Sequence, residues 1–320
     1  MTIFMVSFAY VLDLIFGDPR WFPHPVKIIG SFIKQLEILL YKYKTKKLSG
    51  SILVIIVIST SFLITWLLIK TCSTINIYLG VALQIMFIYT TLSIKDLKLE
   101  TMQVYYTLKQ DNIDSARKNL AMIVGRDTKN LDRREIIRAT VETIAENTVD
   151  GIISPLFYAF IGGAPLAVAY KAVNTLDSTI GYKTEKYIDF GFAASRLDDI
   201  ANFIPARISI LLLPIACLLA GKNAKKCLQI ILRDRNRNPS PNSGIPEAAI
   251  AGALGVQLGG LNSYNSVAVM KPFLGDNINP LEKKHIKEAI KIAYICSALT
   301  LILGMILCLT IKHLTGQEVN

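Results

Sequence analysis

Three long stretches without a charged side chain constrain the fold of this chain more than any other feature. They cover residues 51–69, 71–94 and 292–311. A helix needs about 20 apolar residues to cross the hydrocarbon core of a bilayer, so each stretch is long enough to span one. Charged residues make up only 18% of the chain, whereas soluble domains carry about 25%. We therefore predict an all-α, polytopic integral membrane protein with the lipid bilayer as part of its solvent.

Other apolar segments are shorter or interrupted. Residues 3–16 are apolar except for Asp13, residues 208–221 form a short run, and residues 245–270 are uncharged apart from Glu247. Residues 151–170 are uncharged but contain two prolines and a Gly-Gly pair, which permit non-helical backbone where protein shields it from lipid. The prediction is a single membrane domain over residues 1–320, with small-residue helix packing in the Ala- and Gly-rich run 248–260.

The distribution of charge predicts an orientation. The net charge is +11, but the Lys and Arg residues gather at the ends of apolar segments, which is typical of the cytoplasmic side of a membrane protein and not of nucleic-acid binding. We therefore expect a multi-pass protein of the cell membrane, with an amphipathic helical insert over 95–150 and a basic, proline-rich loop over 222–247 in the cytoplasm. Residues 171–207 face outward if 151–170 crosses fully. We favour the inward alternative, because it brings all the polar motifs to one side.

The first candidate site follows the N-terminal apolar segment. Three prolines within Pro19–Pro25 stiffen the backbone and stop a helix from continuing. Such a rigid segment can hold Asp18, Arg20 and His24 in fixed positions. The alternative is a loop that caps the first helix, with Trp21 as an anchor at the membrane interface.

The second candidate site lies on a predicted helix that begins with a capping box at Asp132 and Glu135. Glu142, Glu146 and Asp150 follow one another at i, i+4 spacing, where like charges destabilise a helix. Only Arg138 is placed in sequence to relieve Glu142. The pattern therefore suggests a missing cation, either Mg²⁺ or a cationic substrate group, with Asn147 beside it to orient a ligand carbonyl. The alternative is a solvated helix face.

Two further motifs combine charges with hydrogen-bonding groups. The first is a mixed set of acids, bases and amides beside apolar segments, which are costly to bury unless paired or used; its members are Lys171, Asn174, Asp177, Lys183, Arg196, Asp198 and Asp199. The alternative is an internal salt-bridge network, which accounts for Arg196 with Asp199. The second is a stiff Pro-Ser-Pro-Asn-Ser-Gly loop with hydroxyl and amide groups suited to phosphate, at Ser240, Asn242 and Ser243.

At these residues the chain resembles a known family, adenosylcobinamide-phosphate synthase (CobD/CbiB). The resemblance covers nearly the whole chain in order and rests on long blocks: Gly17–Val26, Arg126–Thr128, Val141–Gly151, Tyr170–Asp177, Gly181–Lys183, Arg196–Asp199 and Pro239–Gly244. The chain departs from the family at Asn238, where members commonly have His, so no proton transfer is assigned there.

The resemblance implies a ligase of cobalamin biosynthesis that uses Mg²⁺ and ATP as co-substrate. Such enzymes join the propionate carboxylate of a corrinoid, adenosylcobyric acid, to an amino-alcohol phosphate. On this hypothesis Glu142, Glu146 and Asp150 bind Mg²⁺ or the substrate ammonium, while Lys171, Lys183 and Arg196 neutralise phosphate charge. Asp177, Asp198 or Asp199 then acts as the base, and Ser240, Asn242 and Ser243 hold a phosphate.

Two alternatives from other classes remain. Carboxylates near broken helices also fit a transporter of an anionic metabolite, although the halves of the chain show no visible repeat. A non-catalytic scaffold for other membrane enzymes of the corrinoid pathway is the second alternative.

Overall fold

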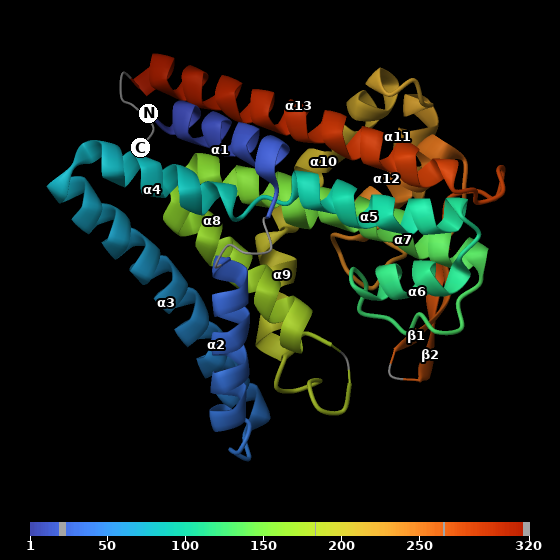
Figure 1. Ribbon diagram of the computed structural model, residues 1–320, viewed down its shortest axis with the longest axis horizontal. Coiled ribbons are helices and arrows are strands. Elements are labelled where there is room, and N and C mark those ends of the chain that lie inside the picture. Colours follow the sequence, from blue (N-terminus) through green and yellow to red (C-terminus); the bar gives the residue numbers. More distant parts are fainter. Residues whose placement is uncertain (19–23, 183, 265, 316–320) are drawn as a thin grey trace. The chain divides into compact units, whose positions relative to one another are not determined.

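The structure is a computed structural model that describes residues 1–18, 24–182, 184–264 and 266–315 (Figure 1). Arg20 and Lys183, two of the predicted site residues, lie outside the described residues. The helices are α1 (Thr2–Phe16), α2 (Pro25–Leu40), α3 (Lys46–Ile75), α4 (Ile77–Tyr89), α5 (Ile94–Lys109), α6 (Ile113–Ala121), α7 (Arg133–Thr148), the π-helical turn η1 (Val149–Ile153), α8 (Ser154–Ile180), α9 (Phe192–Ala201), α10 (Phe203–Leu219), α11 (Ala224–Asp234), α12 (Gly244–Leu254) and α13 (Lys284–Thr315). The strands β1 (Leu258–Tyr264) and β2 (Val267–Leu274) complete the described elements.

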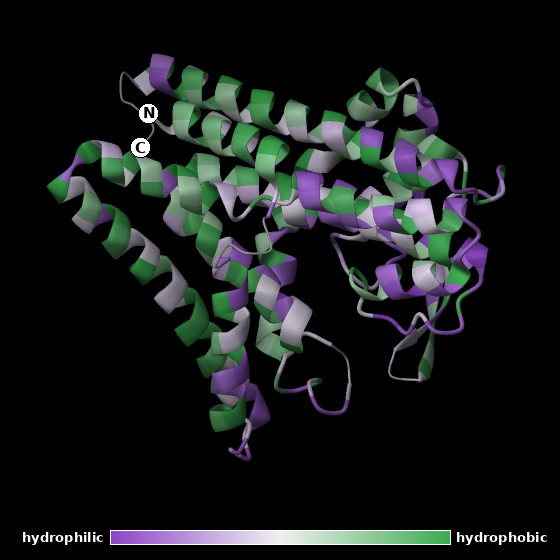
Figure 2. Ribbon diagram, viewed as in Figure 1, coloured by the Kyte–Doolittle hydropathy of each residue, from purple (hydrophilic) through white to green (hydrophobic). Residues whose placement is uncertain are grey.

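Four helical segments in the described part of the chain are long and apolar enough to cross a membrane. They are Lys46–Ile75, Ile77–Lys109, Arg133–Ile180 and Lys284–Thr315. The bent pair α9–α10 adds a fifth if it forms one span. These segments contain the predicted stretches 51–69 and 292–311, whereas the stretch 71–94 is divided by the break at Asn76 between α3 and α4. Hydrophobic residues line most of the length of α3 and α4 (Figure 2). The prediction of an all-α polytopic membrane protein is confirmed.

The chain divides into two compact units, each built from separate parts of the sequence. Unit 1 comprises Met1–Ser93, Ser154–Asn202 and Leu301–Asn320, and unit 2 comprises Ile94–Ile153 and Phe203–Thr300. The segment predicted as a helical insert, residues 95–150, forms α5, α6 and α7 in unit 2 together with residues 203–300. The long helix α13 contributes its first half to unit 2 and its second half to unit 1.

In unit 1, α3 packs against α2, α4, α8 and α9. The core between α2, α3 and α8 contains Ile33, Leu53, Val57, Leu176 and Phe190. On the other side of α3, large apolar side chains are exposed, among them Ile55, Leu63, Ile64 and Leu67. Such a contiguous apolar surface is unfavourable in water, and it suits contact with lipid.

The Gly-Gly pair predicted to interrupt residues 151–170 does so. Gly162 and Gly163 leave helical geometry inside α8, and Gly163 has φ +63° and ψ −156°. Only glycine adopts this combination readily, because it has no Cβ. Pro165 lies two residues later and lacks the N–H that would continue the helix across this point. The break therefore has a specific cause in the sequence.

The loop between α8 and α9 lies against the α2–α3 corner of unit 1. Lys186 forms an ion pair with Glu37 at 2.6 Å, and the Tyr187 hydroxyl donates to the same carboxylate at 2.9 Å. The ring of Phe190 contacts that of Tyr41 edge to face, with centroids 5.3 Å apart. These contacts place residues 184–190 beside the basic segment that joins α2 to α3.

In unit 2, α12 is buried along its whole length and is packed against α7, α10 and α11. The expected packing through small residues is confirmed here: a Cβ on Gly252 would meet the Lys226 carbonyl oxygen at 2.8 Å. The remainder of the same run is not helical. Residues 258–260 begin an antiparallel hairpin of β1 and β2, which was not predicted from the sequence.

Candidate functional site

The helix α7 carries the first part of the candidate site and begins as predicted. The Asp132 side chain accepts from the Glu135 N–H at 2.7 Å, and the Glu135 side chain accepts from the Asp132 N–H at 2.9 Å, so the capping box is confirmed. Two turns later Glu142 is buried, with 2% of its surface exposed. The alternative of a solvated helix face is therefore wrong at this carboxylate.

Glu142 is held by groups from two other segments. Arg126, in the loop before α7, forms an ion pair with it at 2.5 Å. The Gly259 N–H at the start of β1 donates to the other carboxylate oxygen at 2.8 Å. Burial disfavours the charge on Arg126, but the carboxylate of Glu142 outweighs that effect and raises the pKa of Arg126. The expectation that only Arg138 relieves Glu142 is therefore wrong.

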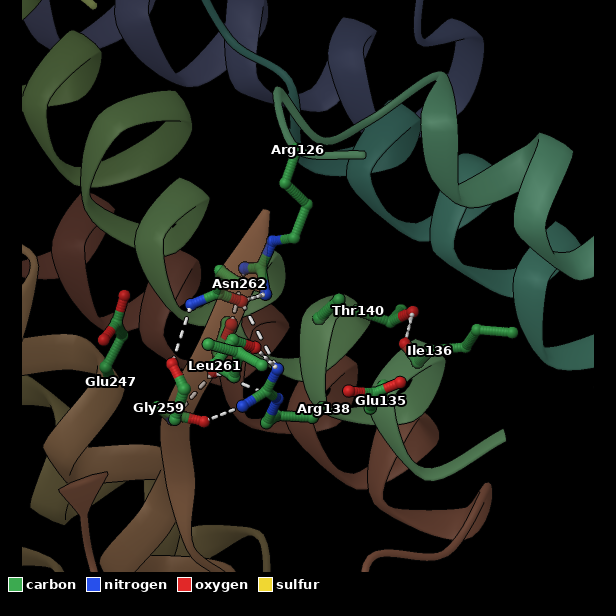
Figure 3. Close-up of polar contacts among 12 residues, drawn as sticks. Arg126, Glu135, Ile136, Arg138, Thr140, Glu247, Gly259, Leu261 and Asn262 are labelled. Atoms are coloured by element: carbon green, nitrogen blue, oxygen red, sulfur yellow. Dashed lines mark hydrogen bonds and ion pairs between the residues drawn. The ribbon is translucent and has the colours of Figure 1, made fainter. Parts of the chain in front are cut away.

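Arg138 instead fixes the hairpin to α7. Its guanidinium donates to the carbonyl oxygens of Gly259 and Leu261, the latter at 2.7 Å, and to the Asn262 side chain at 3.3 Å. Arg126 donates to the same Asn262 oxygen, so the two arginines converge on one amide (Figure 3). The Arg138 Nε lies 3.9 Å from Glu142. This network joins α7, the loop that contains Arg126, and β1.

The predicted Mg²⁺ ligands do not fit a metal site in this geometry. Within the described residues, no three His, Cys, Asp or Glu side chains are grouped to hold a metal ion. Glu142 already bonds Arg126 and Gly259, which removes it from a ligand set with Glu146 and Asp150. Asp150 lies on η1, one helical turn beyond Glu146. A cationic substrate group is the alternative that remains for the carboxylates.

Glu146 has different surroundings from Glu142. It is partly exposed, and the Ser243 hydroxyl donates to it at 3.3 Å. Among the described residues no other hydrogen-bond donor to this carboxylate is present. Ser243 also lies 3.3 Å from the Ser240 hydroxyl. The structure thus brings together Glu146 and the predicted phosphate-binding loop, which lie about a hundred residues apart in the sequence.

The same loop contacts a second buried carboxylate, Glu247 in the first turn of α12. Glu247 has 2% of its surface exposed and accepts from the Asn238 amide at 3.1 Å. Burial raises its pKa to about 8, against the opposing charge of Lys271 on β2. Burial also disfavours the charge on Lys271, but Glu247 and Glu146 raise its pKa overall. Asn238, the departure from the family pattern, is therefore the direct partner of a titratable group.

Two other predicted residues of unit 2 have local partners. The Asn147 amide donates to the Thr143 carbonyl oxygen within α7 at 3.0 Å. Asn242 is buried and accepts from Arg207 at 2.7 Å.

The remaining predicted residues lie in unit 1, and the structure joins some of them. His24 caps α2 by accepting from the Val26 N–H, and its Nε2 lies 3.0 Å from Asp18. Arg196 lies 3.8 Å from Asp199, as the salt-bridge alternative predicts. Asp198 accepts from the Asn202 amide at 3.0 Å, and Asn202 in turn accepts from Ser154 and Tyr170. Lys171, Asn174 and Asp177 follow one another along the second half of α8.

Several residues that shape the unit 2 site were not among the predicted site residues, although Arg126 begins one of the blocks that carry the family resemblance. They are Arg126, Asn262, Lys271, Gly259 and Glu247. Glu247 was detectable as the one charge in the run 245–270. Arg126 and Asn262 are 136 residues apart, and only the hairpin brings them together, so nothing in their local spacing indicated a contact.

Comparisons with known proteins agree with this arrangement of motifs. The family described as CobD/Cbib protein matches residues 6–293. The cobalamin biosynthesis protein CobD of Clostridium tetani is 45% identical over 95% of this chain and 96% of its own length. The CobD protein of Geobacter metallireducens is 44% identical over 95% and 96%, and the cobalamin biosynthesis protein CbiB of Salmonella typhi is 42% identical over 95% and 96%. No solved structure matches the chain. A match over nine-tenths of the sequence leaves one conclusion: the chain belongs to the CobD/Cbib protein family.

Proposed function

We propose that the protein acts in cobalamin biosynthesis as an ATP-dependent amide synthase. It would join the propionate carboxylate of adenosylcobyric acid to an amino-alcohol phosphate and release adenosylcobinamide phosphate. The pathway is supported by the relatives, which are named cobalamin biosynthesis proteins. The reaction is supported by the family resemblance and by the chemistry of the site in unit 2.

The observation that carries the reaction is the state of Glu146. Among the described residues this partly exposed carboxylate has one hydrogen-bond donor, the neutral Ser243 hydroxyl, and the Lys271 charge acts on it without an ion pair within 4 Å. A carboxylate in protein surroundings is stabilised by a cation, and the amine substrate of an amide synthase arrives as an ammonium. Glu142 differs, because it accepts from the Gly259 N–H and its charge is already neutralised by Arg126. Glu146 is therefore the carboxylate best placed to bind the substrate cation.

Amide formation from a carboxylate and an ammonium requires two chemical changes. The carboxylate attacks the γ-phosphorus of ATP, ADP leaves, and an acyl phosphate forms. A base removes a proton from the ammonium, the free amine attacks the acyl carbon, and inorganic phosphate leaves. Asp177, Asp198 and Asp199 are the candidate bases, and Lys171, Lys183 and Arg196 are the candidate groups for neutralising phosphate charge. In this scheme Mg²⁺ enters bound to ATP, since the three carboxylates do not fit a site for it.

We further propose that the site faces the cytoplasm across the cell membrane, where ATP is present. The basic segments at 42–47 and 222–237 support this orientation. Other membrane enzymes of the corrinoid pathway are the expected partners, because the substrate and the product of the reaction are both bulky corrinoids.

A product assay tests the proposal. Purified, detergent-solubilised protein is incubated with adenosylcobyric acid, aminopropanol phosphate and MgATP, and corrinoids and ADP are followed by chromatography and mass spectrometry. We expect a new corrinoid with the mass of the amide, dependent on every component.

Glu146→Gln should abolish turnover without unfolding the protein, whereas Glu185→Gln, on an exposed loop, should leave turnover unchanged. Full turnover by Glu146→Gln would remove this residue from the site. Absence of product from folded, corrinoid-binding protein would argue against the synthase.

A further inference from the structure

Four arginines surround the Pro-Ser-Pro-Asn-Ser loop of unit 2, and two of them are neutralised. Arg233 pairs with Asp234 at 2.8 Å and with Asp276 at 2.7 Å. Arg237 pairs with Asp234 at 3.2 Å. Neither Arg207 on α10 nor Arg235 at the end of α11 has a carboxylate within 4 Å among the residues that the structure describes.

The two unneutralised arginines act on each other. The charge of Arg235 acts on Arg207 electrostatically, and the Arg235 carbonyl oxygen packs against Gly244 at the end of the same loop. Like charges without a counter-ion destabilise a folded chain unless an anion joins them. A dianionic phosphate removes this repulsion, and the planar guanidinium presents paired donors that match its oxygens.

Arg207 is also fixed in direction. Its guanidinium stacks on the Phe203 ring at 3.6 Å and donates through Nη1 to the Asn242 side chain at 2.7 Å and to the Phe203 carbonyl at 3.1 Å. These bonds use a single nitrogen, and no residue that the structure describes accepts from Nε or Nη2. A side chain held in one orientation loses little entropy when it binds.

The loop connects this arginine to Glu146 through a short chain of contacts. Arg207 bonds Asn242, the Asn242 N–H donates to the Ser240 hydroxyl at 3.3 Å, and Ser240 lies 3.3 Å from Ser243. Ser243 then donates to Glu146. The loop packs closely against Arg235 at its C-terminal end, because a Cβ on Gly244 would lie 2.3 Å from the Arg235 carbonyl oxygen. The structure therefore places a carboxylate of α7 and an arginine of α10 in contact with one short loop.

We propose that residues 240–243, with Glu146 at one end and the Arg207–Arg235 pair at the other, bind the amino-alcohol phosphate. The ammonium lies on Glu146, the phosphate lies on the two arginines, and Ser240 and Ser243 bond the short segment between them. This assignment rests on the proposed synthase function and adds the recognition of its second substrate.

The test is a binding measurement on the full-length protein in detergent, by calorimetry and without corrinoid. The probes are (R)-1-aminopropan-2-yl phosphate, the same amino alcohol without phosphate, inorganic phosphate and ATP. We expect Arg207→Gln and Arg235→Gln each to weaken binding of the amino-alcohol phosphate by 10-fold or more and to leave ATP binding unchanged. Arg237→Gln, which removes an arginine already paired with Asp234, is the matched control and should bind like the wild type.

Glu146→Gln separates the two ends of the subsite. It should weaken binding of the amino-alcohol phosphate but not that of inorganic phosphate, which has no ammonium. Arg235 makes no side-chain hydrogen bond within the described residues, so Arg235→Gln keeps the test open if Arg207→Gln fails to fold.

Three outcomes would overturn the assignment. If the arginine variants lose ATP binding to the same extent, Arg207 and Arg235 bind the nucleotide instead. If the variants bind the amino-alcohol phosphate as the wild type does, the two arginines are not part of the subsite. Inorganic phosphate binding as tight as that of the ester would contradict a two-ended site. Because binding is measured without turnover, a failed product assay with arginine-dependent ester binding would count against the synthase alone. Normal turnover with unaffected arginine variants would count against the subsite alone.

Discussion

Among single residues, Arg126 has the clearest structural role, because it supplies the counter-charge of a buried carboxylate. Removing one partner of a buried ion pair leaves the other charge uncompensated and costs about 3–5 kcal/mol. Arg126→Ala should therefore lower the thermal unfolding temperature of the detergent-solubilised protein strongly. The control is Arg133→Ala, which breaks an exposed pair with Asp111 and should cost no more than about 1 kcal/mol. Equal shifts in the two variants would contradict a buried, dependent Glu142.

Glu247 predicts a pH dependence of stability with a definite sign. Burial raises the pKa of its carboxyl from 4.5 to about 8 in the folded protein, so the folded state holds a proton that the unfolded state releases. Stability is then lost as pH rises from about 5 to 8, by about 1.4 kcal/mol per unit from this group. The charged groups that act on it are Lys271, Glu142, Glu146 and Arg126.

The matched variant for this prediction is Glu247→Gln. Glutamine keeps an oxygen that accepts from the Asn238 amide and carries no titratable proton. Its unfolding temperature should vary less with pH between 5 and 8 than that of the wild type, and it should be the more stable protein at pH 8. Parallel pH profiles for the two proteins would show that Glu247 titrates normally in the folded state.

The site shows which contacts of single residues can be predicted from the sequence. The capping box of α7 was predicted because its two residues are three positions apart and bond each other's backbone. The partners of Glu142 were not predicted, because Gly259 reaches it from 117 residues away. Local spacing determines which side chains share a helix face. It does not determine which distant segment covers that face, and the identity of that segment decides whether a carboxylate is free or neutralised.

At the scale of elements, the break in α8 depends on one glycine. Gly163 has φ +63°, where an L-residue is strained by about 1–3 kcal/mol. Gly163→Ala should therefore destabilise the protein by about that amount in thermal unfolding. Gly30, on α2, is the control: nothing lies within 4 Å of an added Cβ, and alanine in a helix is favoured over glycine by about 0.5–1 kcal/mol. Similar behaviour of the two variants would mean that α8 adapts to a straight path.

Some helices and strands could be predicted from the sequence and others could not. The apolar runs of α3 and α13 were predicted because lipid and core both require apolar residues along a span. The hairpin was missed because residues 258–260 continue the Ala- and Gly-rich composition of α12. The helix ends at Gly255, which takes the left-handed conformation with φ +65°. A C-terminal glycine of this kind is a common helix stop, but one glycine among several in the run did not identify it.

At the scale of the whole molecule, contacts within unit 1 bear on the side of the membrane that residues 171–207 face. The α8–α9 loop reaches the α2–α3 corner through Lys186 with Glu37, Tyr187 with Glu37 and Lys47 with Asp189. The corner precedes the span Lys46–Ile75, and the turn at Asn76 follows it. The loop and the corner must therefore lie on one side of the membrane, and Asn76 must lie on the other. These contacts support the inward alternative if the basic corner is cytoplasmic.

Single cysteines at Lys44, Asn76 and Glu185 test this topology, since all three positions are exposed. Cys72, the one native cysteine that is not buried, is first replaced by Ser. A membrane-impermeant maleimide added to intact cells should label the cysteine at 76 but not those at 44 or 185, and permeabilised cells should show all three labelled. Because the ion pair of Lys186 with Glu37 joins the loop to the corner, positions 44 and 185 should respond together under every condition. Labelling of 185 together with 76 would place the α8–α9 loop outside and separate it from the corner that the structure packs it against.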